Sequence, residues 1–472
     1  MVKIKFGTDG WRAVIAEDFT FENLDRVAQA TAAYWAKNPE PGTEKKVVVG
    51  YDRRFLSDQF AMRSAEILAG NGFQVILSKA PNPTQAVSLA VKKANAVGGV
   101  MITASHNPAI FNGFKLKGSF GGSAESSMCQ AIEKMVDATK VKAMPLAEAK
   151  KAKKIQIKDL NPALYAAAKK LVDFKLIANS GVRFAHDALF GVGAGCFDAI
   201  LKGTSCQVTT LNGDANPLFG GINPEPVKQN YGLSAAYLKK NPHDICLVTD
   251  GDADRVGAMD GKGGYLTSHQ LICMLLRHMR ENRGLDGRVV KALTTTSMVD
   301  KMCAHYGLEC VETGVGFKYV AAEMLKGDVL LGAEESGGIG FLGHIPERDG
   351  IAAGMMLLEM LAMEGKSVKQ ILSALTRKFG PHCYARIDTH YPLEKRDELI
   401  AFVRDNPPAK LNGSPVAEVK SYDGVKVVAD SGAWLMIRGS GTEPILRIYA
   451  EADSDANAEK LLKMGVAFTK KV

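Results

Sequence analysis

The chain has 472 residues and a formal net charge of +8, and its contents of 46% hydrophobic and 23% charged residues are typical of a globular protein. The small charge excess, without a Lys/Arg tract interleaved with aromatic residues, argues against nucleic acid as a partner. The start, MVKIKFGTDG, has no apolar segment and no run of about 18 apolar residues occurs, so we expect a cytoplasmic protein with no signal peptide and no membrane contact. The eight cysteines form neither CxxC pairs nor a zinc pattern, which agrees with reduced thiols in that compartment.

The first third of the chain alternates apolar strands and helices. KVVVGYD predicts a strand that ends in a polar loop, and FAMRSAEILAGNGF predicts a helix that stops at residues 70–72. We expect QVILSKA to be the next strand, SLAVKKANAVGG a helix and a turn, and VMITASHNP a strand and a loop. Repeated strand–helix–strand units indicate a mainly parallel sheet, and ligands of such sheets bind at the carboxyl ends of the strands.

The same pattern, an apolar strand followed by a polar loop, occurs again in VRFAHDALFGVGAGCFDAILKG, DICLVTDGDADR, VVKALTTTSMVDKMCAHYG and DVLLGAEESGG. After residue 381 short strands dominate, and one helix, DANAEKLLKMGVAFTKKV, ends the chain. We therefore predict α/β domains over residues 1–160, 161–262 and 263–380, and a smaller α+β domain over residues 381–472.

The most informative motif is DGDADR, residues 250–255, directly after the apolar strand ICLVT. Asp250, Asp252 and Asp254 place three carboxylates on alternate residues, and such charges repel unless a cation lies between them. Oxygen ligands favour Mg²⁺, Ca²⁺ or Mn²⁺, and the alternative is a solvated acidic turn. An EF-hand is excluded because Arg255 and Gly261 stand where it needs glycine and glutamate. Arg255 is expected to brace the loop or to reach a phosphate.

ITASHNP places Ser105 beside His106, but neighbours on an extended chain point opposite ways, so His106 is no obvious base for the serine. By itself, a serine in this position is most often a helix cap or a turn residue. The loop continues through Asn107 and Pro108 to NGFK, which ends at Lys115, and its many donors suit an anionic group. A phosphorylated Ser105 would add an oxygen ligand to the three-carboxylate site.

Two further polar loops suit a sugar phosphate. In GAEESGG, Glu334 and Ser336 are two residues apart and would share a face of an extended loop, where they could bind adjacent hydroxyls; the alternative is a surface turn. IRGSGTEPILR is not a Walker loop, but its turn combines a guanidinium, two hydroxyls and backbone N–H groups, as a phosphate requires; the alternative is an ordinary hairpin. TGVGFKYV and HIPERDG are also polar loops bounded by glycine.

Five motifs in this order resemble those of the α-D-phosphohexomutase superfamily, which includes phosphoglucomutase, phosphomannomutase and phosphoglucosamine mutase. They are FGTDGWR, TASHNP, DGDADR, EESGG and RGSGTEP, and they span residues 6–444. The resemblance implies an α/β fold with three similar α/β domains with mixed sheets and a smaller C-terminal α+β domain around a central cleft. It also implies a Mg²⁺-dependent monomer or homodimer that binds a phosphorylated hexose, with glucose 1,6-bisphosphate as activator and intermediate.

The resemblance assigns a role to each motif. Ser105 resembles the phosphoserine, and its oxygen together with Asp250, Asp252 and Asp254 resembles the Mg²⁺ site. The other roles are proton handling by Lys115 and His106, charge stabilisation by Arg12 and Arg255, sugar binding by Glu334, Ser336, Thr313 and Gly314, and phosphate binding by Arg438, Ser440, Gly441 and Thr442. The phosphoserine would phosphorylate a sugar hydroxyl, and the bisphosphate would turn over and return its other phosphate, while the C-terminal domain closes as a lid.

One departure from the family bears on proton transfer, and one three-residue sequence bears on the substrate. Val315 stands where some relatives carry a histidine, and Lys318 or His344 are candidates to replace it. The EES sequence favours glucose phosphate, because enzymes for mannose and glucose more often have EMS, and those for glucosamine have EQS. We therefore expect interconversion of glucose 1-phosphate and glucose 6-phosphate. The alternatives are the same chemistry on mannose or glucosamine phosphate, a metal-dependent sugar phosphatase, and a non-catalytic protein that binds sugar phosphates.

Overall fold

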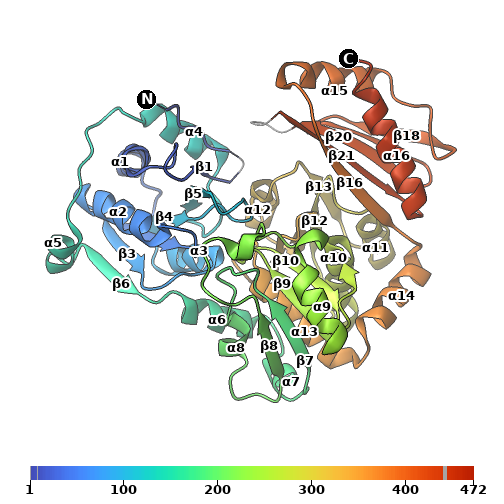
Figure 1. Ribbon diagram of the computed structural model, residues 1–472, viewed down its shortest axis with the longest axis horizontal. Helices are drawn as coiled ribbons and strands as arrows, with labels where there is room; N and C mark the ends of the chain where they lie inside the picture. Colours follow the sequence, from blue (N-terminus) through green and yellow to red (C-terminus); the bar gives the residue numbers. More distant parts are fainter. Residues whose placement is uncertain (1, 8, 440–443) are drawn as a thin grey trace. The chain divides into compact units, whose positions relative to one another are not determined.

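A computed structural model describes residues 2–7, 9–439 and 444–472 of the chain (Figure 1). The chain divides into two compact units: residues 1–287 with 316–368 form the first, and residues 288–315 with 369–472 form the second. Among the described residues, no helix is both long enough and apolar enough to cross a membrane.

The first unit begins with a six-stranded sheet in the order β1-β5-β4-β2-β3-β6. β4, β2, β3 and β6 pair in parallel, as predicted, whereas β5 is antiparallel to both of its neighbours, β4 and β1, so the sheet is mixed. The strands are β1 (Trp11–Val14), β2 (Glu44–Tyr51), β3 (Gln74–Ser78), β4 (Ala96–Ile102), β5 (Phe111–Gly118) and β6 (Ile155–Lys158). The helices are α1 (Phe21–Lys37), α2 (Ser57–Gly70), α3 (Thr84–Lys93), α4 (Ser126–Met135) and α5 (Leu146–Lys151).

Alternation along β2 explains why helices cover both faces of this sheet. Val47 and Val49 lie in one buried cluster with side chains of α1 and α2. Val48, between them, lies in a different cluster with side chains of α3 and of α6 (Asn161–Lys170). A strand buried on both faces reads as the continuous apolar run that predicted it.

The second sheet has the order β11-β10-β9-β7-β8, and it is also mixed. Its strands are β7 (Arg183–Asp187), β8 (Gln207–Leu211), β9 (Ile245–Thr249), β10 (Val256–Asp260) and β11 (Tyr265–Leu266). The helices along this part of the chain are α7 (Phe174–Ala178), α8 (Cys196–Ile200), η1 (Phe219–Gly221), η2 (Lys228–Asn230), α9 (Gly232–Lys240), α10 (Ser268–Arg277) and η3 (His278–Asn282). The first unit ends with α12 (Phe317–Leu325), the antiparallel pair β14 (Val329–Ala333) and β15 (Ile339–Phe341), and α13 (Gly350–Glu364).

The second unit contains a parallel strand pair and an antiparallel sheet. β12 (Arg288–Ala292) and β13 (Cys310–Thr313) are parallel, with α11 (Met298–Tyr306) between them and α14 (Val368–Phe379) later in the chain. The antiparallel sheet has the order β16-β21-β20-β19-β18-β17. Its elements are β16 (Cys383–His390), η4 (Leu393–Lys395), α15 (Arg396–Asp405), β17 (Lys410–Leu411), β18 (Ser414–Lys420), β19 (Val425–Ala429), β20 (Trp434–Gly439), β21 (Ile445–Ala452) and α16 (Asp455–Phe468). The predicted fold class, mixed α/β sheets followed by a smaller C-terminal α+β part, is confirmed.

Two local predictions were wrong. Residues 98–99 lie inside β4 and not in a turn, and a Cβ on Gly98 would come within 2.5 Å of the Trp35 ring, so this glycine makes room for a helix. The C-terminal part contains a second helix, α15, in addition to the one expected at the end of the chain. Only Leu399 and Val403 of α15 are buried, so its apolar signal is weak.

Candidate active site

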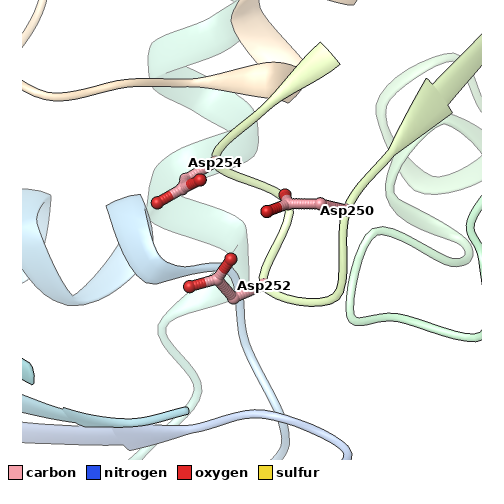
Figure 2. A group of neighbouring side chains, drawn as sticks. All are labelled: Asp250, Asp252 and Asp254. Atoms are coloured by element: carbon pink, nitrogen blue, oxygen red, sulfur yellow. The ribbon is translucent and has the colours of Figure 1, made fainter. Parts of the chain in front are cut away.

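The three predicted carboxylates lie together in the turn between β9 and β10. Asp250, Asp252 and Asp254 are fully buried, and one oxygen from each lies within 4.8 Å of the others. Ala253 adopts a left-handed conformation with φ of 58°, and its N–H donates to the carbonyl of Asp250, which closes the turn. Figure 2 shows the three carboxylates gathered around a common space beside the turn.

This turn fits a divalent cation. Within the described part of the chain, Oδ1 of Asp252 and Oδ1 of Asp254 are buried without a hydrogen-bond partner, which is costly for a carboxylate unless a cation binds it. Burial, followed by the neighbouring carboxylates of Asp252 and Asp254, raises the pKa of Asp250 well above its usual value. A cation among the three would relieve that repulsion, and all-oxygen ligands suit Mg²⁺.

Ser105 lies directly against this turn. It follows β4, is 1% exposed and has φ of 52°, which is uncommon for a residue other than glycine. Its Oγ donates to Oδ2 of Asp250 at 3.0 Å, and its backbone N–H donates to Oγ1 of Thr103 at 2.8 Å. A Cβ on Gly251 would lie 2.5 Å from the carbonyl oxygen of Ser105, so the two loops pack with backbone against backbone. The structure therefore brings the predicted phosphoserine and the predicted metal ligands together.

Lys115, on β5, joins the same cluster. Its Nζ lies 2.8 Å from Oδ2 of Asp252 and 3.4 Å from Oδ2 of Asp254. It also lies 2.8 Å from Oδ2 of Asp9, a residue of the FGTDGWR motif to which the sequence assigned no role. Burial by itself lowers the pKa of Lys115, but the carboxylates of Asp252 and Asp9 outweigh burial and raise it above its usual value. The side chain is thus held as an ammonium.

His106 is the second predicted proton-handling residue. Its Nδ1 lies 3.3 Å from Oγ of Ser105, so the two side chains are within reach although they are neighbours in sequence. Burial, followed by the guanidiniums of Arg255 and Arg12, lowers the pKa of His106 well below its usual value. The imidazole is therefore neutral at pH values near neutrality.

The two predicted charge-stabilising arginines border the cluster. Arg12 donates to Oδ1 of Asn107 at 2.6 Å, which places its guanidinium beside the Ser105 loop. Nε of Arg255 lies 3.9 Å from Oδ2 of Asp250 and 3.9 Å from Oδ1 of Asp254. One guanidinium thus lies beside the Ser105 loop and the other beside two of the three carboxylates.

Glu334 follows β14, but the loop is not extended as expected. The N–H of Gly337 donates to the carbonyl of Glu334 at 3.0 Å, so residues 334–337 form a tight turn, and Glu334 and Ser336 do not share a face through strand alternation. The left-handed φ of 87° at Gly337 makes this turn possible. Glu334 is buried, which raises its pKa, and Ser336 is half-buried.

Arg348, which the sequence reasoning did not single out, links this turn to the metal site. Its guanidinium lies 2.8 Å from Oδ2 of Asp254, 2.7 Å from Oδ2 of Asp9 and 3.6 Å from Oε2 of Glu334. The only sequence signal was the polar loop HIPERDG. A buried arginine between a candidate metal ligand and a candidate sugar ligand holds both carboxylates in fixed positions.

The candidate phosphate clamp lies in the second unit and is described in part. Nε of Arg438 donates to Oδ1 of Asp423 at 2.9 Å. The backbone N–H of Val315, directly after Thr313 and Gly314, donates to Oδ2 of the same carboxylate at 2.7 Å. One aspartate thus connects the Thr313–Gly314 loop to the clamp arginine. Ser440, Gly441 and Thr442 lie outside the described residues.

The two candidates for replacing the third-domain histidine have other partners. Nζ of Lys318 donates to Oγ of Ser126 at 2.7 Å. Nε2 of His344 lies 2.8 Å from Oδ2 of Asp349, whose other oxygen caps α13. A catalytic role for either side chain stays a prediction.

Family models for four consecutive domains match the chain. They are described as phosphoglucomutase/phosphomannomutase alpha/beta/alpha domain I, matching residues 3–142, domain II, matching 163–263, and domain III, matching 267–379. The phosphoglucomutase/phosphomannomutase C-terminal domain matches residues 399–467.

Individual relatives align over nearly the whole chain. The phosphoglucomutase/phosphomannomutase of Thermococcus kodakarensis is 28% identical over 98% of this chain and 97% of its own. The phosphoglucosamine/phosphogalactosamine mutase of Sulfurisphaera tokodaii is 28% identical over 97% of both chains. A crystal structure from Thermus thermophilus, described as a candidate phosphomannomutase, is 35% identical over 99% of both chains with a TM-score of 0.87.

Proposed function

We propose that this chain, which belongs to the α-D-phosphohexomutase superfamily, interconverts glucose 1-phosphate and glucose 6-phosphate through a phosphorylated Ser105. Membership supports the broader statement directly: the chain is a phosphohexomutase whose substrate is a phosphorylated hexose. The observation that carries the proposal is the 3.0 Å hydrogen bond from Oγ of Ser105 to Asp250, inside a buried loop of three carboxylates.

In the proposed first half-reaction, the bond between Oγ of Ser105 and phosphorus breaks while a bond from phosphorus to a sugar hydroxyl oxygen forms. The hydroxyl proton leaves to a base, and the neutral imidazole of His106, beside Oγ of Ser105, is the proposed acceptor. Lys115, held as an ammonium beside Asp252, is the proposed donor to the sugar oxygen that leaves in the second half-reaction. The second half-reaction is the reverse transfer from the other phosphate of the bisphosphate. Mg²⁺ held by Asp250, Asp252 and Asp254 would supply positive charge that offsets the charge on the transferred group.

The remaining candidate residues are proposed to bind different parts of the sugar phosphate. Glu334 and Ser336 would bind sugar hydroxyls together with Thr313 and Gly314, and Arg438 with residues 440–442 would bind the phosphate that is not transferred. The EES sequence at residues 334–336 supports glucose as the sugar. The names of the relatives cover glucose, mannose, glucosamine and galactosamine, so the sugar is the finer part of the proposal.

A turnover assay with three substrates tests this proposal. Purified protein with Mg²⁺ receives glucose 1-phosphate, mannose 1-phosphate or glucosamine 1-phosphate, each with its matching sugar bisphosphate. We expect the highest kcat/KM with glucose 1-phosphate. The Ser105→Ala variant should keep its thermal unfolding midpoint and lose turnover with all three substrates.

The other outcomes separate the alternatives. A preference for mannose or glucosamine phosphate would keep the mechanism and overturn glucose as the substrate. Release of inorganic phosphate without isomerised sugar would favour a metal-dependent phosphatase. Full turnover by Ser105→Ala would contradict the phosphoserine mechanism itself.

A further inference from the structure

Arg54 binds the backbone of the loop that carries Ser105. It follows β2, and its side chain is completely buried. One terminal nitrogen, Nη2, donates to the carbonyl oxygens of Ser105 at 2.7 Å and Asn107 at 2.6 Å. The other, Nη1, donates to the carbonyl oxygens of Pro108 at 2.8 Å and Phe111 at 3.0 Å. One guanidinium therefore satisfies four carbonyls within seven residues, from 105 to 111.

Arg54 is itself held in one orientation. Its Nε lies 3.2 Å from Oδ2 of Asp52, and its guanidinium lies 4.9 Å from the centre of the Phe219 ring. The same carboxylate oxygen of Asp52 accepts a hydrogen bond of 2.6 Å from Oγ1 of Thr103, which in turn accepts the N–H of Ser105. The Asp52 carboxylate and the Phe219 ring fix the orientation of the Arg54 guanidinium. Through Thr103, Asp52 also contacts the start of the Ser105 loop.

The conformation of the Ser105 loop depends on the Arg54 guanidinium. The loop carbonyls turn toward one another and would repel without a buried donor between them. The carbonyl oxygen of Pro108 also accepts the N–H of Phe111 at 3.0 Å. Nη2 of Arg54 serves the carbonyl oxygens of Ser105 and Asn107. Ser105 has a left-handed φ of 52°, a conformation that persists in a non-glycine residue only when its surroundings enforce it. The carbonyl oxygen of Ser105 is also the atom on which Gly251 packs. The Arg54 bonds thus determine where Oγ of Ser105 stands relative to the carboxylates.

We propose that Arg54 is a positioning residue that holds the Ser105 loop in the conformation required for phosphoryl transfer to the sugar. The inference rests on the proposed function, because it assumes that Ser105 carries the phosphate. Among the described residues, Arg54 bonds to the loop carbonyls and pairs with Asp52 and makes no hydrogen bond to Oγ of Ser105, so we infer that it acts through the loop. Lysine keeps the charge but cannot reproduce the planar fork that serves four acceptors at once.

The test compares Arg54→Lys with the neighbouring control Arg53→Lys. Arg53 donates to the carbonyl oxygen of Gly213, and among the described residues it makes no hydrogen bond or ion pair with the Ser105 loop. Each protein is first phosphorylated with glucose 1,6-bisphosphate, and the occupancy of Ser105 is measured by intact mass and peptide mapping. Single-turnover transfer to glucose 6-phosphate and loss of phosphate to water are then timed for the occupied fraction.

For Arg54→Lys we expect transfer to the sugar to slow about 100-fold, as for a misplaced reacting group, with KM changed less than about threefold. Hydrolysis by water should slow much less, so the ratio of transfer to hydrolysis falls. Arg53→Lys should match the wild type. Phe219→Leu, which removes only the ring beside the guanidinium, should lower the same ratio by a smaller factor and decides the matter if Arg54→Lys does not fold.

The outcomes separate this inference from the proposed function. A wild-type chain that accepts no phosphate on Ser105 would overturn the proposed function and this inference with it. A wild-type chain that is phosphorylated and turns over, together with Arg54 and Phe219 variants whose transfer ratio is unchanged, would overturn this inference alone. A loss of thermal stability without a change in that ratio would assign Arg54 a purely structural role.

Discussion

The two carboxylate oxygens of Asp252 have different surroundings. Oδ2 accepts hydrogen bonds from Oγ1 of Thr84 at 2.7 Å and from Nζ of Lys115 at 2.8 Å, so the side chain cannot easily rotate. Oδ1 is buried without a hydrogen-bond partner among the described residues, so it is the oxygen suited to a cation. Oδ2 therefore holds the side chain in place, and Oδ1 is the oxygen expected to bind the metal.

We therefore predict that Asp252→Asn weakens Mg²⁺ binding by about tenfold or more, because it removes a ligand charge at constant size. A Mg²⁺ titration of turnover and a direct calorimetric titration measure the effect. Asp214→Asn, at an exposed position, is the control and should leave both titrations unchanged. An unchanged Mg²⁺ affinity in Asp252→Asn would contradict the metal assignment.

The sequence predicted those site residues whose neighbours in the chain reveal them. Three aspartates on alternate residues repel one another in any compact turn, so the motif itself indicated a cation. Arg54, Arg348 and Asp9 gave no such signal, because their partners are far away in sequence. Asp9 and Arg348, for example, are ion-paired across 339 positions. Only the folded chain brings such groups together.

At the scale of elements, the contact between the Ser105 loop and the 250–255 turn allows a steric test. The Cβ of Gly251→Ala would lie 2.5 Å from the backbone oxygen of Ser105, closer than real Cβ contacts, and backbone cannot rotate away as a side chain can. We expect kcat to fall about 100-fold while the protein stays folded, because the two loops must move apart. Steady-state kinetics and the thermal unfolding midpoint measure the two effects.

A matched glycine is available for comparison. Gly232 opens α9, and a Cβ there would have no atom within 4 Å in the described structure. Gly232→Ala should therefore keep full activity and stability. If Gly251→Ala were equally active, the two loops would be less tightly coupled than their backbone contact indicates.

The strand β7 makes stability depend on pH. His186 is fully buried, its Nε2 lies 3.0 Å from Oγ1 of Thr249, and burial lowers its pKa to about 4. Because the unfolded value is about 6.5, the unfolded chain binds the extra proton first, and stability falls as the pH drops from about 6.5 toward 4. We expect this one group to cost about 2 kcal/mol of unfolding free energy between about pH 7 and about pH 5.

Chemical unfolding of wild type and His186→Asn at both pH values measures this cost. The wild type should lose about 2 kcal/mol more than the variant on acidification. An equal loss in both proteins would show that other groups cause the acid sensitivity. The comparison is internal to each protein, so any general destabilisation by the substitution cancels.

Local sequence patterns predicted most elements of the first unit, and the exceptions have physical causes. Strands buried on both faces appeared as apolar runs, as in β2, β4 and β9. The turn at residues 334–337 was only the alternative to an extended loop, because Gly337 permits a left-handed conformation without requiring one. Helix α15 was not predicted because its charged residues outnumber its buried apolar residues. In each case the choice depends on packing that the local sequence does not contain.

At the scale of the molecule, the candidate functions divide between the two compact units. Ser105, the three candidate metal ligands and Glu334 belong to the first unit, whereas Thr313, Gly314 and Arg438 belong to the second. The fold class was predictable because each domain contains apolar strands that end in a recognisable polar motif, and these motifs follow one another along the sequence. The predicted central cleft and the predicted domain limits stay predictions, because no local pattern determines how separately packed parts meet.

This division predicts that the phosphate clamp can be damaged without disturbing the metal site. Arg438→Ala should raise KM for the sugar phosphate about 10- to 100-fold, because it removes the proposed charge-assisted contact with the phosphate that is not transferred. The Mg²⁺ titration should be unchanged. The ion pair between Arg438 and Asp423 is partly exposed, so the unfolding midpoint of Arg438→Ala should fall only slightly.

Arg386→Ala on the strand β16 is the matched control, because this arginine pairs with Asp388 at 2.7 Å on the surface of the same sheet. It should leave KM unchanged and shift the unfolding midpoint by a similarly small amount. A lower unfolding midpoint for Arg438→Ala with an unchanged KM would instead mean that the arginine only stabilises its hairpin. An equal rise in KM for both variants would mean that the phosphate responds to the charge of the whole sheet and not to a specific clamp.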